Sequence, residues 1–260
     1  MGTKLPLKIP AAWYPSPINL PERKAGKVYV KHRYALDKTP IIGLRQAFAR
    51  GIQPASAMLK EPLRYHELSD KNGVWMTDLP EELFQIEEAL AMIKPSGRVL
   101  VAGLGLGIMA KRCAQIAKHV TVVEINKQII KLCAAPFYKT VRADIFDYLN
   151  QHDIDPAFSH YILDTWRGTG ETTWWEEVLP LRRLIRNIHG AKPKIHCWAE
   201  DIMQGQVSVN LLGPHRHWHY TEFPPSMSKK EVAWFFKNIG LPEWEKRYGH
   251  MIPRKGRELP

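Results

Sequence analysis

The sequence predicts an α/β fold with a doubly wound, mostly parallel sheet (Rossmann-like), preceded by a small N-terminal β-rich lobe. Three observations predict it. From residue 98 onward, short apolar runs alternate with stretches of helical spacing. A glycine-rich turn, Gly103–Gly107, directly follows the first run, and the next three runs end on Glu124, Asp144 and Asp164. Strict alternation of strand and helix requires parallel pairing through helical crossovers, so these acids should meet at one sheet edge.

The N-terminal third of the sequence is predicted to contain an extended arm and a β-rich lobe. Residues 1–25 contain five prolines and little periodicity, which indicates an extended arm. Residues 26–78 predict the β-rich lobe: a strand over 27–35, a basic helix over 41–50, and a hairpin of 64–68 with 73–77. The lobe should end at Asp78, which is placed to cap the following helix, as far as Ile93.

Residues 79–225 form the predicted core domain. Its expected strands and helices, in chain order, are strand 98–102, helix 108–118, strand 119–124, helix 127–133, strand 140–143, a short helix, strand 160–164, helix 174–188 and strand 194–198. Residues 206–212 and 215–222 then predict an antiparallel hairpin at the sheet edge. Residues 226–260 predict a helix over 228–239 and a basic tail.

Composition narrows the class of protein. Hydrophobic residues make up 45% and charged residues 24% of the 260 residues, as in folded globular chains. We find no apolar run long enough to span a bilayer and no signal peptide, so a cytoplasmic protein without membrane partners is expected. The three cysteines form no CxxC pair, which disfavours disulfides and a zinc site.

The net charge of +11 points to a polyanionic partner. Nucleic acid is the candidate, bound through a basic surface; a merely solvated basic surface is the alternative. The C-terminal segment adds Lys229, Lys230, Lys246, Arg247, Arg254, Lys255 and Arg257. The sequence leaves the oligomeric state open, a homodimer included.

The glycine turn predicts a nucleoside site. Backbone N–H groups and a helix N-terminus at such a turn can approach a polar ligand closely. Glu124 ends the next strand, where a carboxylate can accept both hydroxyls of a ribose. Because Gly105, Gly107 and Ala110 also satisfy the GxGxxA pattern of dinucleotide sites, this part alone does not choose the nucleoside. Acids after the third and fourth strands could then bind an adenine amino group and face a reacting group.

This constellation resembles the class I S-adenosylmethionine-dependent methyltransferases. The resemblance implies S-adenosylmethionine as cofactor. It also implies that the cofactor-binding residues are Gly103, Leu104, Gly105, Gly107, Glu124, Ile125, Asp144, Ile145 and Asp164.

A second resemblance concerns residues 63–166. The stretch 72–90 (NGVWMTDLPEELFQIEEAL) resembles the hairpin and gate helix of spermidine synthases, and Val101 matches their apolar residue before the glycine turn. The whole stretch is more similar to the spermidine-synthase-like predicted methyltransferases of phages and bacteria. The carried-over positions are the turn Asn72-Gly73-Val74, the hydroxyl residue Thr77, and the acids Glu81, Glu82 and Glu87. The sequence departs from aminopropyltransferases at Met76, Gln85 and Arg167, and a fixed arginine would repel a polyamine.

Asp164 and Trp166 are the candidate catalytic residues. Methyl transfer from a sulfonium is an in-line displacement, so the protein supplies alignment and, for a weak nucleophile, a base. Asp164 could orient the nucleophile or hold the ammonium of the donor's methionine part, and Trp166 could form a wall beside the sulfonium. Trp174, Trp175 and Trp198 are expected near the same pocket mouth, for stacking or for packing.

Other motifs leave the acceptor open. The Asn/Asp-Pro-Pro-aromatic signature of amino-methyltransferases is absent after the fourth strand, as is a Pro-Cys pair. His215, His217 and His219 share one face of a predicted strand, where a solvated or phosphate-facing role is favoured over a metal site. A methyltransferase is the leading prediction. An aminopropyltransferase using decarboxylated S-adenosylmethionine and a non-catalytic nucleoside- or nucleic-acid-binding module are the alternatives.

Overall fold

Five short strands pair into one parallel sheet. The computed structural model describes residues 18–36, 59, 62–151, 158–166, 173–190, 192–200 and 203. Within it the strands are β5 (Arg98–Ala102), β6 (His119–Glu124), β7 (Lys139–Arg142), β8 (His160–Leu163) and β9 (Lys194–Cys197). Their spatial order is β7-β6-β5-β8-β9, and every neighbouring pair is parallel. The predicted doubly wound parallel sheet is confirmed.

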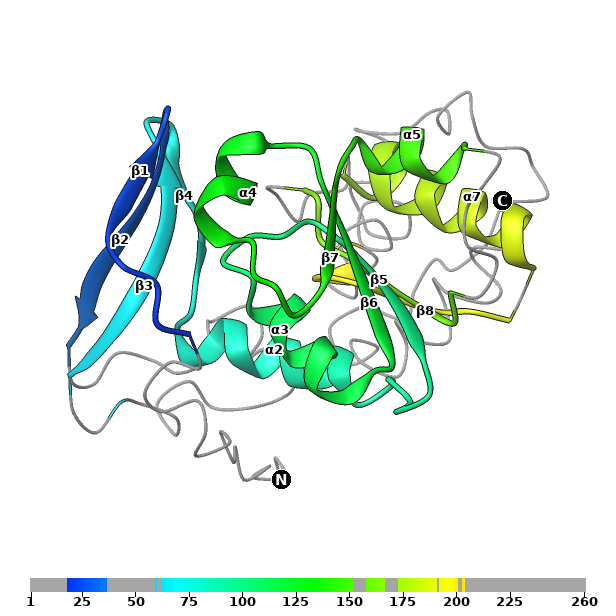
Figure 1. The fold of residues 1–260 in the computed structure, drawn as a ribbon, viewed down its shortest axis with the longest axis horizontal. Coiled ribbons are helices and arrows are strands. Elements are labelled where there is room, and N and C mark those ends of the chain that lie inside the picture. The colour runs from blue at the N-terminus through cyan, green and yellow to red at the C-terminus, as the bar shows by residue number, and fades with distance from the viewer. Residues whose placement is uncertain are drawn as a thin grey trace, which may run out of the picture.

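The central strand shows why helices cover both faces of this sheet. Side chains alternate across a strand, so Val99 and Val101 of β5 enter one hydrophobic cluster while Leu100 and Ala102 enter another. The first cluster includes side chains of α2 (Pro80–Leu90), α3 (Ile108–Ile116) and α4 (Lys127–Cys133). The second includes side chains of α5 (Ile145–Leu149) and α7 (Leu179–His189). Figure 1 shows α2 and α3 on one side of the sheet and α5 and α7 on the other.

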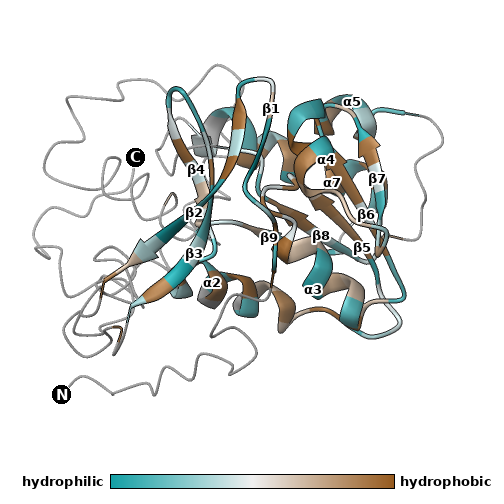
Figure 2. Ribbon diagram, turned by 60° about the vertical axis from the view of Figure 1, so that its left-hand side comes forward, coloured by the Kyte–Doolittle hydropathy of each residue, from teal (hydrophilic) through white to brown (hydrophobic). Residues whose placement is uncertain are grey.

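The N-terminal lobe is an antiparallel sheet of four strands in sequential order. They are β1 (Arg23–Ala25), β2 (Val28–Ala35), β3 (Leu63–Asp70) and β4 (Gly73–Thr77). Val28, Val30 and Leu68 are buried in the same cluster as α3 and α4, so the lobe packs directly on the core domain (Figure 2). The predicted β-hairpin is confirmed. Residues 23–25, expected inside an extended arm, instead pair with β2, because an edge strand there satisfies its backbone hydrogen bonds.

Asp78 does not cap the helix that follows it. Helix α2 begins at Pro80 with Leu79 as its N-cap and without a side-chain cap, and it ends at Leu90 rather than near Ile93. The Asp78 carboxylate is buried and instead accepts hydrogen bonds from the backbone N–H and the ring Nδ1–H of His66, the latter at 2.7 Å. Asp78 therefore ties β3 to the start of α2.

The predicted helix over 174–188 has two parts. Residues Trp174–Val178 form a π-helical turn, η3, and α7 follows directly. Pro180 lies in the first turn of α7 and lacks an N–H, so it cannot complete a regular α-helical bond four residues back. The π-helical turn, which is wider than an α-helical turn, accommodates the missing hydrogen bond. As shown below, this turn lies at the pocket.

Several predicted elements lie outside the described residues: the helix over 41–50, the hairpin over 206–222, the helix over 228–239 and the basic tail. Within the part of the chain that is described, no helix is long and apolar enough to cross a bilayer.

Candidate functional site

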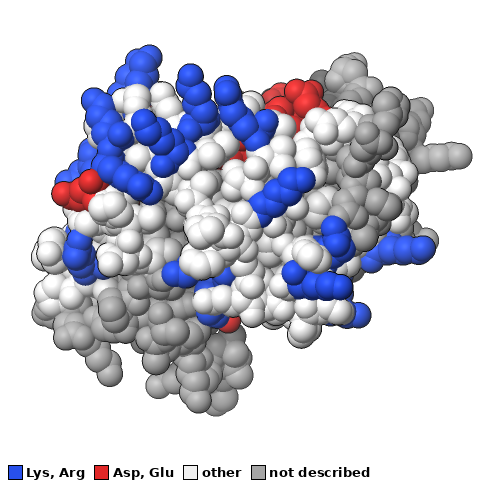
Figure 3. Space-filling view, in the orientation of Figure 1, with Lys and Arg blue, Asp and Glu red and all other residues white. Residues whose placement is uncertain are grey.

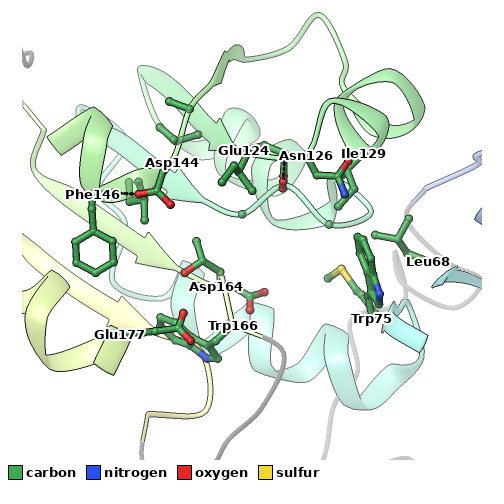
Figure 4. A pocket seen from close by; sticks show the side chains of 18 residues that line it. Leu68, Trp75, Glu124, Asn126, Ile129, Asp144, Phe146, Asp164, Trp166 and Glu177 are labelled. Carbon is green, nitrogen blue, oxygen red and sulfur yellow. Dashed lines mark hydrogen bonds between the residues drawn. The ribbon is translucent and has the colours of Figure 1, made fainter. Parts of the chain in front are cut away.

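A pocket opens where the chain changes direction across the sheet. After β5 the chain builds β6 and β7 on one side, then returns to place β8 on the other side of β5. Ligands of open α/β sheets bind at the carboxyl ends of the strands at such a point. Gly103 follows β5 and Asp164 follows β8, and the Asp164 N–H donates to the Ala102 carbonyl at 2.9 Å. Both residues line a pocket of about 270 Å³ (Figure 4).

The glycine turn follows a path that only glycine adopts easily. Gly103 has φ +92° and packs against the carbonyl oxygen of Asp164, so a side chain there would collide with backbone. Gly105 has φ +52° and lies beneath the sulfur of Met76, which accepts the Leu106 N–H at 3.3 Å. The turn thus brings bare backbone to the pocket, with a methionine from β4 lying over it.

Glu124 is held in place by two backbone donors. Its Oε2 accepts the Leu104 N–H at 2.9 Å, and its Oε1 accepts the Asn126 N–H at 2.7 Å. The side chain is buried but lines the pocket. A carboxylate has about four acceptor positions, so two remain for a ligand. The geometry suits a diol, such as the two hydroxyls of a ribose.

Asp144 caps a helix and also lines the pocket. As N-cap of α5, its Oδ1 accepts the N–H groups of Phe146 at 2.8 Å and Asp147 at 3.4 Å. Its Oδ2 has no hydrogen-bond partner among the described residues, and Asp144 lines the pocket. Helix capping therefore fixes one oxygen and leaves the other for an amino group of a ligand.

Asp164 carries the most perturbed acid of the pocket. Burial and the nearby Glu124 carboxylate raise the pKa of Asp164 from 3.8 to about 7. Near neutral pH this carboxyl is therefore divided between its protonated and ionised forms. A group with a pKa near the working pH is suited to accept and release a proton.

Glu177 is a pocket residue that the sequence analysis missed. It comes from η3 and lies beside Trp166 and Asp164 in Figure 4. Burial, followed by the charges of Glu176 and Asp144, raises the pKa of its carboxyl. Glu177 lies in a Trp-Trp-Glu-Glu-Val segment that matches no motif. Pro180, two residues after that segment, was the one available signal of an irregular turn.

All the charged side chains in the described pocket lining are acidic. It contains the four carboxylates of Glu124, Asp144, Asp164 and Glu177, and no Lys, Arg or His occurs among the described lining residues. The other lining residues are Leu68, Trp75, Met76, Gly103, Gly105, Val123, Ile125, Asn126, Ile129, Ala143, Ile145, Phe146, Thr165 and Trp166. The chain as a whole is strongly basic, so this concentration of acids is local. The pocket is suited to a cationic ligand with apolar and hydroxyl parts.

The structure brings most of the predicted site residues together. Those lining the pocket are Gly103, Gly105, Glu124, Ile125, Asp144, Ile145, Asp164 and Trp166. Leu104 and Gly107 are not in the lining. Leu104 contributes its N–H to Glu124, and Gly107, with φ +79°, is the N-cap residue of α3.

The tryptophans lie differently from the expectation of a shared pocket mouth. Trp166 lines the pocket, but it is buried and its ring N–H donates to the Trp198 carbonyl at 3.2 Å. Trp174 is fully buried in the core, and neither it nor Trp198 is in the described lining. Trp75 of β4 lines the pocket instead. The buried tryptophans are largely packing residues because their large apolar rings fill the core beside α5 and α7.

The residues carried over from spermidine synthases do not form part of the described lining. Glu87 pairs with Arg112 at 3.0 Å and joins α2 to α3, and neither Thr77 nor Glu82 lines the pocket. The side chain of Glu81 and the whole of Arg167 lie outside the described residues. Of that motif, only Met76 and Trp75 reach the pocket.

Metal ligands and reactive thiols are not apparent in the described part of the chain. It contains no group of three His, Cys, Asp or Glu residues placed to hold a metal ion, and His215, His217 and His219 lie outside it. Burial raises the pKa values of the Cys113 and Cys133 thiols to about 12, and that of Cys197 well above its usual value. The three thiols are therefore protonated at neutral pH.

Three solved structures that resemble this chain are each less than 25% identical to it. No family model matches the chain, and no curated protein matches it. The 23S rRNA methyltransferase ErmE is 23% identical, with a TM-score of 0.28 over 43% of this chain and 40% of that chain. A dimethyladenosine transferase from Plasmodium falciparum is 19% identical, with a TM-score of 0.36 over 48% and 44%. The YcgJ protein from Bacillus subtilis is 13% identical, with a TM-score of 0.33 over 49% and 56%. Likeness at this level carries no argument about function, which must come from the pocket itself.

Proposed function

We propose that this protein is an S-adenosylmethionine-dependent methyltransferase, with donor binding assigned to residues 79–225. One observation carries the proposal: the pocket at the sheet edge joins a glycine turn to four carboxylates, and its described lining has no basic side chain. The chemistry of the donor matches this arrangement part by part.

Charge favours a sulfonium nucleoside over a dinucleotide. S-adenosylmethionine carries a sulfonium, an ammonium and one carboxylate, so it is a net cation. The pyrophosphate of NAD is an anion, which the carboxylates of Glu124, Asp144, Asp164 and Glu177 would repel. The same carboxylates attract a cation and raise its local concentration.

Residues of the pocket have hydrogen-bonding groups that match the adenosine part of the donor. The free acceptor positions of Glu124 suit the ribose hydroxyls, and Oδ2 of Asp144 suits the adenine amino group. Ile125 is 62% exposed at the pocket rim, where its side chain could cover one face of a base. Because Gly103 and Gly105 have no Cβ, the Asp164 carbonyl and the Met76 sulfur can pack directly against the turn.

Asp164 is the candidate base. When bound, the donor supplies a methyl group on a good leaving group, so the protein contributes alignment and proton transfer. With a pKa of about 7, Asp164 can take the proton of a nucleophile at neutral pH. Trp166, fixed by its bond to the Trp198 carbonyl, would form the wall beside it. Asp164→Asn should lower turnover at least about tenfold if the base contributes.

A specific observation also favours a second function. Four carboxylates suit decarboxylated S-adenosylmethionine, which has a higher positive charge, and the polyamine acceptor of an aminopropyltransferase. Met76 opposes this function, because a thioether covers the turn where those enzymes place a glutamine.

Calorimetric titration with four ligands separates the possibilities. The purified protein is titrated with S-adenosylmethionine, S-adenosylhomocysteine, decarboxylated S-adenosylmethionine and NAD. We expect binding of the first two and weak or no binding of NAD. Preference for the decarboxylated donor would establish the aminopropyltransferase alternative, and silence toward all four would refute nucleoside binding.

A matched pair of variants tests the adenine assignment. Asn can still cap α5, so Asp144→Asn should preserve the fold while changing the group that faces the ligand. We expect S-adenosylmethionine affinity to fall about 10- to 100-fold. Asp147→Asn makes the same charge change on the same helix at an exposed residue outside the described lining, and should leave affinity unchanged. Equal effects of the two substitutions would contradict the assignment.

A further inference from the structure

Basic side chains gather beside the acidic pocket. Figure 3 shows Lys and Arg concentrated over the part of this face where Figure 1 places the N-terminal sheet and α4. We call this surface the basic rim. Its exposed members are Arg23, Lys24, Lys27, Lys71, Lys127 and Lys131.

Packing of the lobe on α4 assembles the rim. Strand β1 contacts α4, and the turn at Gly26 lies against the side chain of Gln128. In the sheet, the β1–β2 turn and the β3–β4 turn lie at the same end, because Ala25 pairs with Val28 and Tyr29 pairs with Ser69. Cations that are distant in the sequence therefore lie on one continuous surface.

Helix α4 joins the rim to the pocket. Asn126, its N-cap, and Ile129 line the pocket, while Lys127 and Lys131 are exposed to solvent. Positions four apart on a helix share a face, so both lysines project on the same side of α4. A ligand that contacts Lys127 and Lys131 is therefore separated from the pocket only by helix α4.

Next to the rim, the half-buried ring of Tyr29 lies between the rim residue Lys24 and the half-buried Lys31. The ammonium groups of Lys24 and Lys31 lie 4.9 and 5.0 Å from the centroid of the Tyr29 ring. Interleaved cations and aromatic rings are typical of surfaces that bind single-stranded nucleic acid.

The acidic pocket and the basic rim favour different parts of one ligand, because their charges have opposite signs. The pocket's carboxylates would repel a phosphate, whereas the rim's lysines would attract it. A polynucleotide matches this division, since its phosphates are anionic and its bases are neutral. A base of a single strand enters a pocket at a lower cost than a base of a duplex, which must first be unpaired and unstacked.

We infer that the basic rim binds the phosphate backbone of a single-stranded nucleic acid and directs a base of that strand into the acidic pocket. This inference rests on the proposed function, because it assigns the class of methyl acceptor. It differs from the sequence-based expectation of a basic C-terminal segment, which lies outside the described residues.

The test compares three double variants with equal change of charge. Lys24→Gln/Lys27→Gln alters the lobe and Lys127→Gln/Lys131→Gln alters α4. The control, Lys118→Gln/Lys192→Gln, alters two exposed lysines that precede β6 and β9. They lie at the amino ends of the strands, whereas the pocket lies at the carboxyl ends. Binding of a fluorescent 20-nucleotide RNA, with DNA of the same sequence in parallel, is measured by anisotropy from low to moderate salt.

Each rim pair should weaken binding of the RNA and of the DNA and reduce the slope of log K against log salt by about 1.4, whereas the control pair should change little. Equal loss in all three variants, or no binding by the wild-type protein, would overturn the inference. So would tighter binding of vesicles containing anionic lipid through the same lysines.

Calorimetry of the variants separates this inference from the proposed function. S-adenosylmethionine affinity should be unchanged in all three double variants, because none of the six lysines lines the described pocket. If the donor binds but the rim substitutions do not affect RNA binding, the acceptor assignment fails alone. If RNA binding depends on the rim but no donor binds, the proposed function fails and the binding surface remains.

Discussion

Replacing Asp164 by Asn should stabilise the protein in a pH-dependent way. The Asp164 side chain has no hydrogen-bond partner among the described residues, so an isosteric amide removes its charge and little else. Burial and Glu124 raise the pKa of Asp164 from 3.8 to about 7, so the folded state binds this proton more tightly than the unfolded state. The stabilisation from this proton is complete below about pH 4 and is lost as the pH rises through about 7.

The pKa sets the magnitude. A pKa of about 7 in place of 3.8 corresponds to a loss of up to about 4 kcal/mol in the free energy of unfolding between pH 4 and pH 8. The side chain is partly exposed to the pocket, where water screens the charge, so about 2 kcal/mol is a realistic expectation. The free energy of unfolding of Asp164→Asn should not show this loss between pH 4 and pH 8.

Urea unfolding of the wild-type protein and of Asp164→Asn at pH 4.5 and pH 8 measures the effect. We expect the two proteins to be nearly equal in stability at pH 4.5 and the variant to be more stable at pH 8. The difference in stability between the two proteins isolates the contribution of Asp164, because other titrating groups affect both proteins alike. A stability difference that is the same at both pH values would refute the raised pKa.

Ligand binding offers an independent check of the same group. A cationic donor near Asp164 favours its ionised form, so binding near pH 7 should release a fraction of a proton. Calorimetry of S-adenosylmethionine binding in buffers of different ionisation enthalpy counts that proton. Asp164→Asn should abolish the release; a release that persists in the variant would assign it to another group.

Three further substitutions test the site and its support. Glu124→Ala should weaken S-adenosylmethionine binding by about 2–3 kcal/mol in calorimetry, because charge-assisted bonds to the ribose are lost, and unchanged affinity would remove Glu124 from the site. Gly105→Ala should destabilise the protein by about 1–3 kcal/mol in urea unfolding, because φ is +52° and the new Cβ meets the Met76 sulfur. Adding Met76→Ala should recover only part of this loss, and full recovery would mean that backbone strain is negligible. Asp78→Ala should cost about 3 kcal/mol in the same assay, because it leaves buried donors of His66 unpaired, and a cost below about 1 kcal/mol would contradict a structural role.

The order of elements was predictable because it depends on local patterns. Apolar runs of strand length alternate with helical spacing, and this alternation alone requires a parallel sheet with crossovers. In such a sheet the carboxyl ends of neighbouring strands share an edge. The convergence of Gly103, Glu124, Asp144 and Asp164 therefore followed from their places in the sequence.

Long-range contacts could not be read from those patterns. Asp78 has the sequence position of a helix cap, but in the structure its carboxylate accepts from two donors on His66. Arg182 likewise pairs with Glu200 at 2.6 Å, across a separation that no local motif spans. Which partner a polar side chain takes depends on which donors packing brings within reach.

The amino-acid sequence by itself determined the parallel sheet, the glycine turn and the acids at the strand ends, because period and spacing act within a few residues. Only the tertiary structure decided the character of the pocket and its surroundings. It brought Glu177 to the acids through a π-helical turn, placed Met76 over the glycine turn, and packed the lobe on α4 so that separate lysines form one surface. These arrangements depend on burial of apolar surface between distant segments, which acts through three-dimensional packing rather than through neighbours in the chain.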